Sequence, residues 1–177
     1  MSAGMATGLL TAPAAMPITI AANNGAPALT LAGCDAAAAQ SLAHQFAAMP
    51  PWSRYPFSPK ALAGYLAGHE PGAPRYAIHV DGALAGALGL RLNWLRGPYV
   101  QFLGILPEQQ GHGAGRAVIS QLIADARASG DRNVWVAASS FNADALRFYE
   151  RLGFTRTALL NGLVQDGIDE VLLRLRL

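Results

Sequence analysis

Residues 99–116 read Tyr-Val-Gln-Phe-Leu-Gly-Ile-Leu-Pro-Glu-Gln-Gln-Gly-His-Gly-Ala-Gly-Arg. The apolar first half predicts a strand from Tyr99 to Leu106. An amphipathic helix is predicted over 117–128, directly after the stretch. The first N–H groups of a helix lack intrahelical acceptors, and glycines let an anion approach them closely. A strand, a glycine loop and a helix in this order predict a ligand that carries phosphate. The three loop glycines stand at alternate positions: Gly111, Gly113 and Gly115.

The rest of the chain predicts one mixed sheet covered by helices, which is an α/β (α+β) fold class. Asp81-Gly82 is a strong hairpin signal between two alternating apolar segments. Proline, serine and glycine mark the ends of the helices. The predicted strands are 28–31, 75–80, 84–92, 99–106, 133–138, 154–160 and 169–176, and the predicted helices are 34–49, 59–68, 117–128 and 143–152.

The 177 residues suit a single domain with its own core. Residues 1–26 are rich in Ala, Gly and Pro without a sustained period, so they are expected to form an extension, with at most a short extended piece at Ile18–Ile20. The folded domain is expected over 27–177.

Bulk properties exclude several classes of protein. Hydrophobic residues make up 52% of the chain and charged residues 14%, which excludes a disordered chain. The net charge of +2, without a Lys/Arg cluster, gives no reason to expect nucleic acid as a partner. No apolar run is long enough for a membrane span. A single cysteine, Cys34, and an N-terminus without a basic start predict a cytoplasmic protein. No metal site is predicted.

The glycine loop fits two common phosphate-binding motifs poorly. A P-loop needs a Lys and a Ser or Thr after its last glycine, and both are missing here. A dinucleotide fingerprint needs Gly-x-Gly-x-x-Gly, whereas this loop has Gly-x-Gly-x-Gly. Taken alone, the loop therefore leaves a turn without a ligand open.

Two segments together resemble the GNAT superfamily of N-acetyltransferases. Gln110, Gly113 and Gly115 match the acetyl-CoA-binding pattern Gln/Arg-x-x-Gly-x-Gly/Ala of that family. The segment from Asn142 to Phe154 resembles its second signature, and the order of predicted elements also agrees. The resemblance implies the GNAT fold, with splayed central strands, and acetyl-CoA as cosubstrate.

The resemblance also implies which residues hold the cofactor. The pyrophosphate would lie on the backbone of the glycine loop, and the pantetheine would pair with the preceding strand, whose N–H groups would polarise the thioester carbonyl. Asn142 either contacts the cofactor or only caps a helix. The implied cofactor-binding residues are Leu103, Gly104, Ile105, Leu106, Gln110, Gly111, His112, Gly113, Ala114, Gly115, Arg116 and Asn142.

Tyr149 resembles the family's general acid, which would protonate the leaving thiolate. The alternative is a core tyrosine whose hydroxyl is satisfied elsewhere. In the ribosomal-protein alanine acetyltransferases, a related branch, a Glu stands where this chain has Ala137, so the general base is not identified. Spacing singles out none of the remaining acids: Glu70, Glu108, Asp166, Asp169 and Glu170.

The acceptor is expected at the segment between the first two helices. Trp52, Tyr55 and Phe57 could line an apolar wall there, or form a plug over the core. Pro-Trp-Ser at 51–53 is similar to the alanine acetyltransferase branch. The sequence leaves open a protein N-terminus, a lysine, an amino acid or a small amine as acceptor, and it leaves a homodimer open.

Two functions follow from these residues. The first is an N-acetyltransferase that moves an acetyl group from acetyl-CoA to a primary amine by direct attack, since Cys34 lies far from the motifs. The second is a non-catalytic acyl-CoA-binding module, which the alanine at position 137 motivates.

Overall fold

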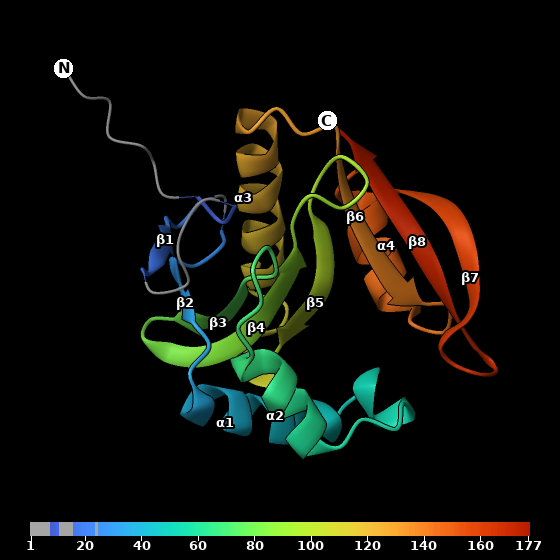
Figure 1. Ribbon diagram of the computed structural model, residues 1–177. Coiled ribbons are helices and arrows are strands. Elements are labelled where there is room, and N and C mark those ends of the chain that lie inside the picture. The colour runs from blue at the N-terminus through green and yellow to red at the C-terminus, as the bar shows by residue number, and fades with distance from the viewer. Residues whose placement is uncertain (1–7, 11–15, 24) are drawn as a thin grey trace.

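The computed structural model describes residues 8–10, 16–23 and 25–177. They form one eight-stranded sheet in the order β1-β2-β3-β4-β5-β6-β8-β7, in which only β5 and β6 pair in parallel (Figure 1). The predicted α+β class is confirmed. The strands are β1 Ile18–Ile20, β2 Leu29–Gly33, β3 Arg75–Val80, β4 Ala83–Arg91, β5 Tyr99–Ile105, β6 Asn133–Ser139, β7 Thr155–Gln165 and β8 Ile168–Arg176.

Local chemistry sets where the helices begin. The side chains of Asp35, Ser58 and Asn142 each accept a hydrogen bond from the N–H of the residue three positions later. The helix after the glycine loop instead begins with Gly113 in the left-handed conformation. Among the described residues, no helix is both long enough and apolar enough to cross a bilayer. The helices are α1 Ala36–Ala47, α2 Pro59–Ala67, α3 Ala114–Ala128 and α4 Ala143–Arg151, with short 3₁₀ turns at Trp52–Arg54 and Pro107–Gln109.

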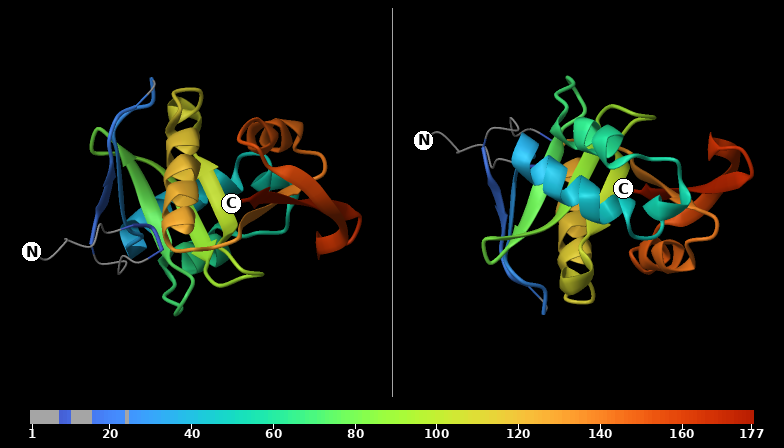
Figure 2. Two further views of the ribbon diagram at one scale, coloured as in Figure 1. Left: turned by 90° about the horizontal axis from the view of Figure 1, so that it is seen from above. Right: turned by 90° about the horizontal axis from the view of Figure 1, so that it is seen from below.

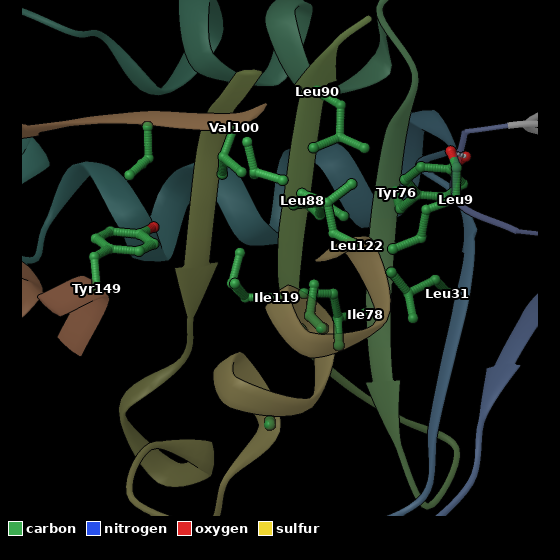
Figure 3. Close-up of a cluster of buried hydrophobic side chains, with 14 of the residues drawn as sticks. Leu9, Leu31, Tyr76, Ile78, Leu88, Leu90, Val100, Ile119, Leu122 and Tyr149 are labelled. Carbon is green, nitrogen blue, oxygen red and sulfur yellow. Dashed lines mark hydrogen bonds between the residues drawn. The ribbon is translucent and has the colours of Figure 1, made fainter. Parts of the chain in front are cut away.

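The helices cover both faces of the sheet (Figure 2). On one face, α1 and α2 bury Phe46 and Leu62 against β3, β4 and β5. On the other face, α3 buries Ile119 and Leu122 against the same strands, and α4 adds Tyr149 to that core (Figure 3). Burying such side chains stabilises the fold by roughly 1.5–3 kcal/mol each, so the sheet is fixed from both sides.

The sheet is split between its two parallel strands. Register pairs join β5 to β6 only at Tyr99↔Trp135 and Val100↔Val136. Beyond these pairs the strands separate toward their C-terminal ends, as Figure 1 shows. The backbone of β5 from residue 101 onward is therefore unpaired on its β6 side, while it stays paired to β4 on the other.

One helix boundary differs from the expectation, and residues before position 27 add to the core. Helix α3 begins at Ala114 and not at residue 117, because Gly113 caps it and brings the last loop glycine into its first turn. Residues before position 27 also pack on the sheet: β1 covers Ile18–Ile20, where a short extended piece was expected, and pairs with β2, and the Leu9 side chain is fully buried in the main core. An isolated leucine gives no sequence period, so its burial could not be predicted from local pattern.

Candidate functional site

The glycine loop presents a row of free backbone donors. Gly111 and Gly113 adopt positive φ values of 80° and 86°. The first α-helical bond of α3 runs from the N–H of Ala117 to the Gly113 carbonyl, at 2.9 Å. Among the described residues, no acceptor faces the N–H groups from Gly111 to Arg116. Six adjacent donors at a helix N-terminus make a strong anion-binding arrangement.

The open edge of β5 leads directly into this loop. The N–H of Leu106 donates to Ala85 in β4 at 2.8 Å, so the polar groups of Ile105 point the other way, into the split. The Gln110 side chain confirms this direction, because its amide donates to the Ile105 carbonyl at 2.8 Å. That bond holds the loop against the strand and leaves the N–H of Ile105 free for a ligand.

A cavity of about 1030 Å³, here called the glycine-loop cavity, lies over the split. Its walls come from the end of β5, the loop, the start of α4 and the segment around Trp52. Three arginines line it, namely Arg54, Arg116 and Arg151, against one carboxylate, Asp144, which is paired with Arg147 at 2.5 Å. The cavity therefore has the size and the positive charge to hold an extended phosphate-bearing ligand.

A second cavity of about 510 Å³, here called the aromatic cavity, adjoins the first. Trp52, Leu103 and Tyr149 line both cavities. Stacking fixes part of its wall: the Trp52 ring lies 4.8 Å from each of the Phe46 and Phe102 rings. The glycine-loop cavity and the aromatic cavity thus meet beside the splayed end of β5.

Tyr149 stands where the two cavities meet. It is 6% exposed, and burial raises the pKa of its phenol. Among the described residues, its hydroxyl has no hydrogen-bond partner. A phenol that stays protonated at neutral pH and has a free O–H can donate a proton to a ligand atom.

Among the described residues that line the aromatic cavity, one carries a carboxylate, on β8. Glu170 is 6% exposed, and its Oε1 accepts a short hydrogen bond from the Tyr55 hydroxyl. That hydroxyl also lies 2.5 Å from the Ser139 hydroxyl. Burial raises the pKa of Glu170 above its ordinary value, although the hydrogen bond from Tyr55 and the nearby Ser139 hydroxyl lower it. Burial of the Tyr55 phenol, together with its hydrogen bond to Glu170 and the charge of that carboxylate, raises the pKa of Tyr55 to about 12.

The structure brings most of the predicted site residues together. Trp52 lines both cavities, and Tyr55 and Phe57 line the aromatic cavity, which favours a cavity wall over a plug. Leu106 and His112 stand apart: the Leu106 side chain packs in the α1–α2 core, and His112 is exposed outside both cavities. Of the residues implied to bind the cofactor, those that line the glycine-loop cavity are Leu103, Gly104, Ile105, Gln110, Gly111, Gly113, Ala114, Gly115, Arg116 and Asn142.

The sequence left the roles of several lining residues open. Arg54 lies in the acceptor segment, yet it lines the glycine-loop cavity, with its guanidinium 4.4 Å from the Phe141 ring centroid. Asn142 was left between two roles, and its side chain caps α4 while also lining both cavities. Glu170 can be distinguished from the other acids only when the β6–β8 register is known, because that register places it opposite Ser139.

Comparison with known proteins identifies the family. The model of the Acetyltransferase (GNAT) family matches residues 37–154, which contain the glycine loop, the split strands and Tyr149. The chain therefore belongs to the GNAT family of acetyltransferases. The predicted resemblance is confirmed.

Individual relatives point to the same family. The streptothricin acetyltransferase of Streptomyces lavendulae is 28% identical over 95 residues, which is 53% of this chain and half of that protein. A nourseothricin acetyltransferase structure is 29% identical, with a TM-score of 0.55 over 60% of this chain and 66% of that one. The ribosomal L7/L12 α-N-protein acetyltransferase shares the fold over 96% of this chain and all of its own, with a TM-score of 0.72 at 19% identity.

Proposed function

We propose that this protein is an N-acetyltransferase that moves an acetyl group from acetyl-CoA to a primary amine by direct attack. The observation that carries the proposal is that the glycine-loop cavity and the aromatic cavity meet at the buried phenol of Tyr149. Two ligands in adjoining cavities can react without a covalent enzyme intermediate. Cys34 is buried and lines neither cavity, so it offers no acyl-enzyme nucleophile.

The donor would occupy the glycine-loop cavity. The free N–H groups of Gly111 to Arg116 would hold the pyrophosphate, and the arginines would add charge-assisted bonds. The pantetheine arm would extend along the open edge of β5. There the N–H of Ile105 would face the thioester carbonyl and stabilise the negative charge that develops on its oxygen. The structure of a Bacillus anthracis streptothricin acetyltransferase holds acetyl coenzyme A, which supports this choice of donor for the fold.

The acceptor amine would enter through the aromatic cavity. Its nitrogen attacks the acetyl carbon, the C–N bond forms, and the C–S bond breaks. The departing thiolate takes the Tyr149 proton, and the protonated amide nitrogen gives up a proton as the phenol is restored. The raised pKa of Tyr149 keeps the phenol protonated at neutral pH until the thiolate leaves.

The alternative function is a non-catalytic acyl-CoA-binding module. Ala137 motivates it, because this residue lines the aromatic cavity without a titratable group. A module needs the glycine-loop cavity but has no use for a second cavity that ends at a free phenol. The two-cavity arrangement therefore favours the enzyme.

The deciding experiment measures CoA release from acetyl-CoA with a panel of amines. The panel should contain streptothricin, an alanine-initiated peptide, free lysine and simple monoamines, since the relatives suggest both small-molecule and peptide acceptors. We expect turnover with at least one amine. In Tyr149→Phe we expect kcat to fall about 100-fold or more, as for loss of a general acid.

Two controls make this result specific. Tyr149→Phe keeps the ring and removes a hydroxyl that has no partner among the described residues, so its unfolding free energy and its Kd for acetyl-CoA should stay close to wild type. Tight acetyl-CoA binding without turnover of any amine would instead establish the binding module.

A further inference from the structure

We infer that Glu170 is the carboxylate that receives the acceptor's ammonium group and takes its proton, and that the acceptor is a primary monoamine on an apolar body. The inference rests on the proposed function, since it concerns the acceptor half of the same site. Its basis is the isolation of this one carboxylate in an aromatic cavity, on the strand that follows the β7–β8 turn.

Charge is the first argument. Of the described residues that line the aromatic cavity, Glu170 is the only one with a charged side chain. No described salt bridge involves it. A buried carboxylate without a cation is costly, and a cation bound next to it recovers part of that cost. The cavity is therefore complementary to a ligand with one positive charge.

The hydrogen bonds around Glu170 form a fixed cradle. Because the single Tyr55 proton goes to Oε1, the Ser139 hydroxyl must donate to Tyr55. These two hydrogen bonds join the segment after α1 to the end of β6 and to β8. Among the described residues, Oε2 has no hydrogen-bond partner and remains free to accept a bond from a ligand. The carboxylate is thus held in one orientation with one oxygen open.

The walls define the rest of the ligand. Trp52, Phe57, Tyr65, Tyr99 and Phe102 give the cavity aromatic sides, and Leu163 and Val164 close it from β7. A single carboxylate among such walls suits one ammonium group on an apolar or aromatic body. A polyamine would leave further charges against apolar surface, so it should bind less well.

Glu170 can also act as the general base that Ala137, without a titratable group, cannot provide. In the ionised form, Glu170 takes one proton from the bound ammonium, leaving a neutral amine whose lone pair can attack the acetyl carbon. The carboxyl then releases that proton to water after the product leaves. The other described titratable groups that line the cavity are phenols with raised pKa values, so Glu170 is the one described group there that can serve as a carboxylate base. The phenols are Tyr55, Tyr65, Tyr99 and Tyr149.

The test uses 2-phenylethylamine as a probe, with the full chain saturated with CoA for binding and with acetyl-CoA for turnover. Calorimetry should show that Glu170→Gln raises the Kd for the probe about 10-fold or more, since a charge-assisted hydrogen bond to the ammonium is lost. In turnover, kcat should fall by a further factor of about 100, and the acidic limb of the kcat/KM profile should move up to the pKa of the probe's own ammonium group, which must then lose its proton to water. Wild type should prefer the probe to spermidine.

Two further variants separate this role from a structural one. Tyr55→Phe keeps the carboxylate but removes a bond that lowers its pKa, so the acidic limb should move to higher pH and the loss of kcat/KM should be larger at low pH than at high pH. Asp166→Asn removes a charge from the same hairpin outside both cavities and should behave as wild type. The Kd for acetyl-CoA should be unchanged throughout.

The possible outcomes are distinct. Equal probe binding by wild type and Glu170→Gln, an acidic limb in that variant at the wild-type position, or equal losses in Glu170→Gln and Tyr55→Phe at every pH would overturn the role of Glu170. A preference for spermidine would overturn the monoamine assignment. Probe binding that depends on Glu170 but gives no turnover with any amine would refute the proposed enzyme while leaving ammonium recognition in place.

Discussion

At the scale of single residues, burial favours the charge state that Tyr149 needs and opposes the one that Glu170 needs. Burial keeps Tyr149 neutral, which is the form that a proton donor needs. Burial of Glu170 opposes the charged form that an ammonium ligand needs, so the protein holds that charge only with help from Tyr55 and Ser139. A residue that is kept at a cost to stability is a sign of selection for activity.

This cost predicts how stability changes with pH. The pKa of Glu170 is higher in the folded chain than in the unfolded chain, so its stabilising effect is fully present below the unfolded value and is lost as pH rises through the folded value. Glu170→Gln does not titrate, and its amide oxygen can still accept from Tyr55. Urea unfolding should therefore show the variant gaining stability relative to wild type between pH 4 and pH 8. A gain that shrinks over this range would contradict the assigned direction of the pKa.

At the scale of elements, the start of α3 determines where the loop donors point. Gly113 has a φ of 86°, and a Cβ added to it would lie 3.1 Å from the Cβ of Ala26. Gly115 has helical geometry, and its added Cβ would meet Phe148 at an ordinary 3.5 Å. The two glycines of one motif therefore have different physical roles.

Alanine substitutions should separate these roles. Gly113→Ala should destabilise the fold by about 1–2 kcal/mol, because an L-residue is strained in the left-handed region, and should weaken acetyl-CoA binding by turning the free N–H groups. Gly115→Ala should change stability between zero and a gain of about 1 kcal/mol, since alanine is the better helix former. Urea unfolding of both variants, with acetyl-CoA calorimetry of the first, measures the difference. Losses of equal size would show that space and not backbone conformation decides both positions.

The elements also show which features the sequence could predict. The hairpin at Asp81-Gly82, the caps at Ser58 and Asn142 and the glycine loop depend on local chemistry, and they were predicted within a few residues. Placement of Glu170 and Arg54 in the cavities depends on strand register and on how the segment after α1 folds back. Such contacts join residues more than 80 positions apart, as Tyr55 and Ser139 are, and no local pattern encodes them.

At the scale of the whole molecule, Leu9 near the N-terminus packs in the main core. The Leu9 side chain is fully buried beside Tyr76, whose hydroxyl donates to the Leu9 carbonyl at 3.0 Å (Figure 3). The N–H of Leu9 donates to Asp125 on α3 at 2.6 Å, and Gln121 holds the other oxygen of that carboxylate. The segment thus connects the first strands to the helix that carries the glycine loop.

Leu9→Ala tests this connection. Removing a fully buried leucine should lower the unfolding free energy by about 2–5 kcal/mol, because the cavity left behind adds to the lost burial. Met16→Ala is the matched control, since Met16 is 57% exposed in the same N-terminal region and its loss should cost less than about 0.5 kcal/mol. Both are measured by urea unfolding. If the two variants unfold at the same urea concentration, the segment around Leu9 contributes nothing to stability, and the folded unit begins only at β1.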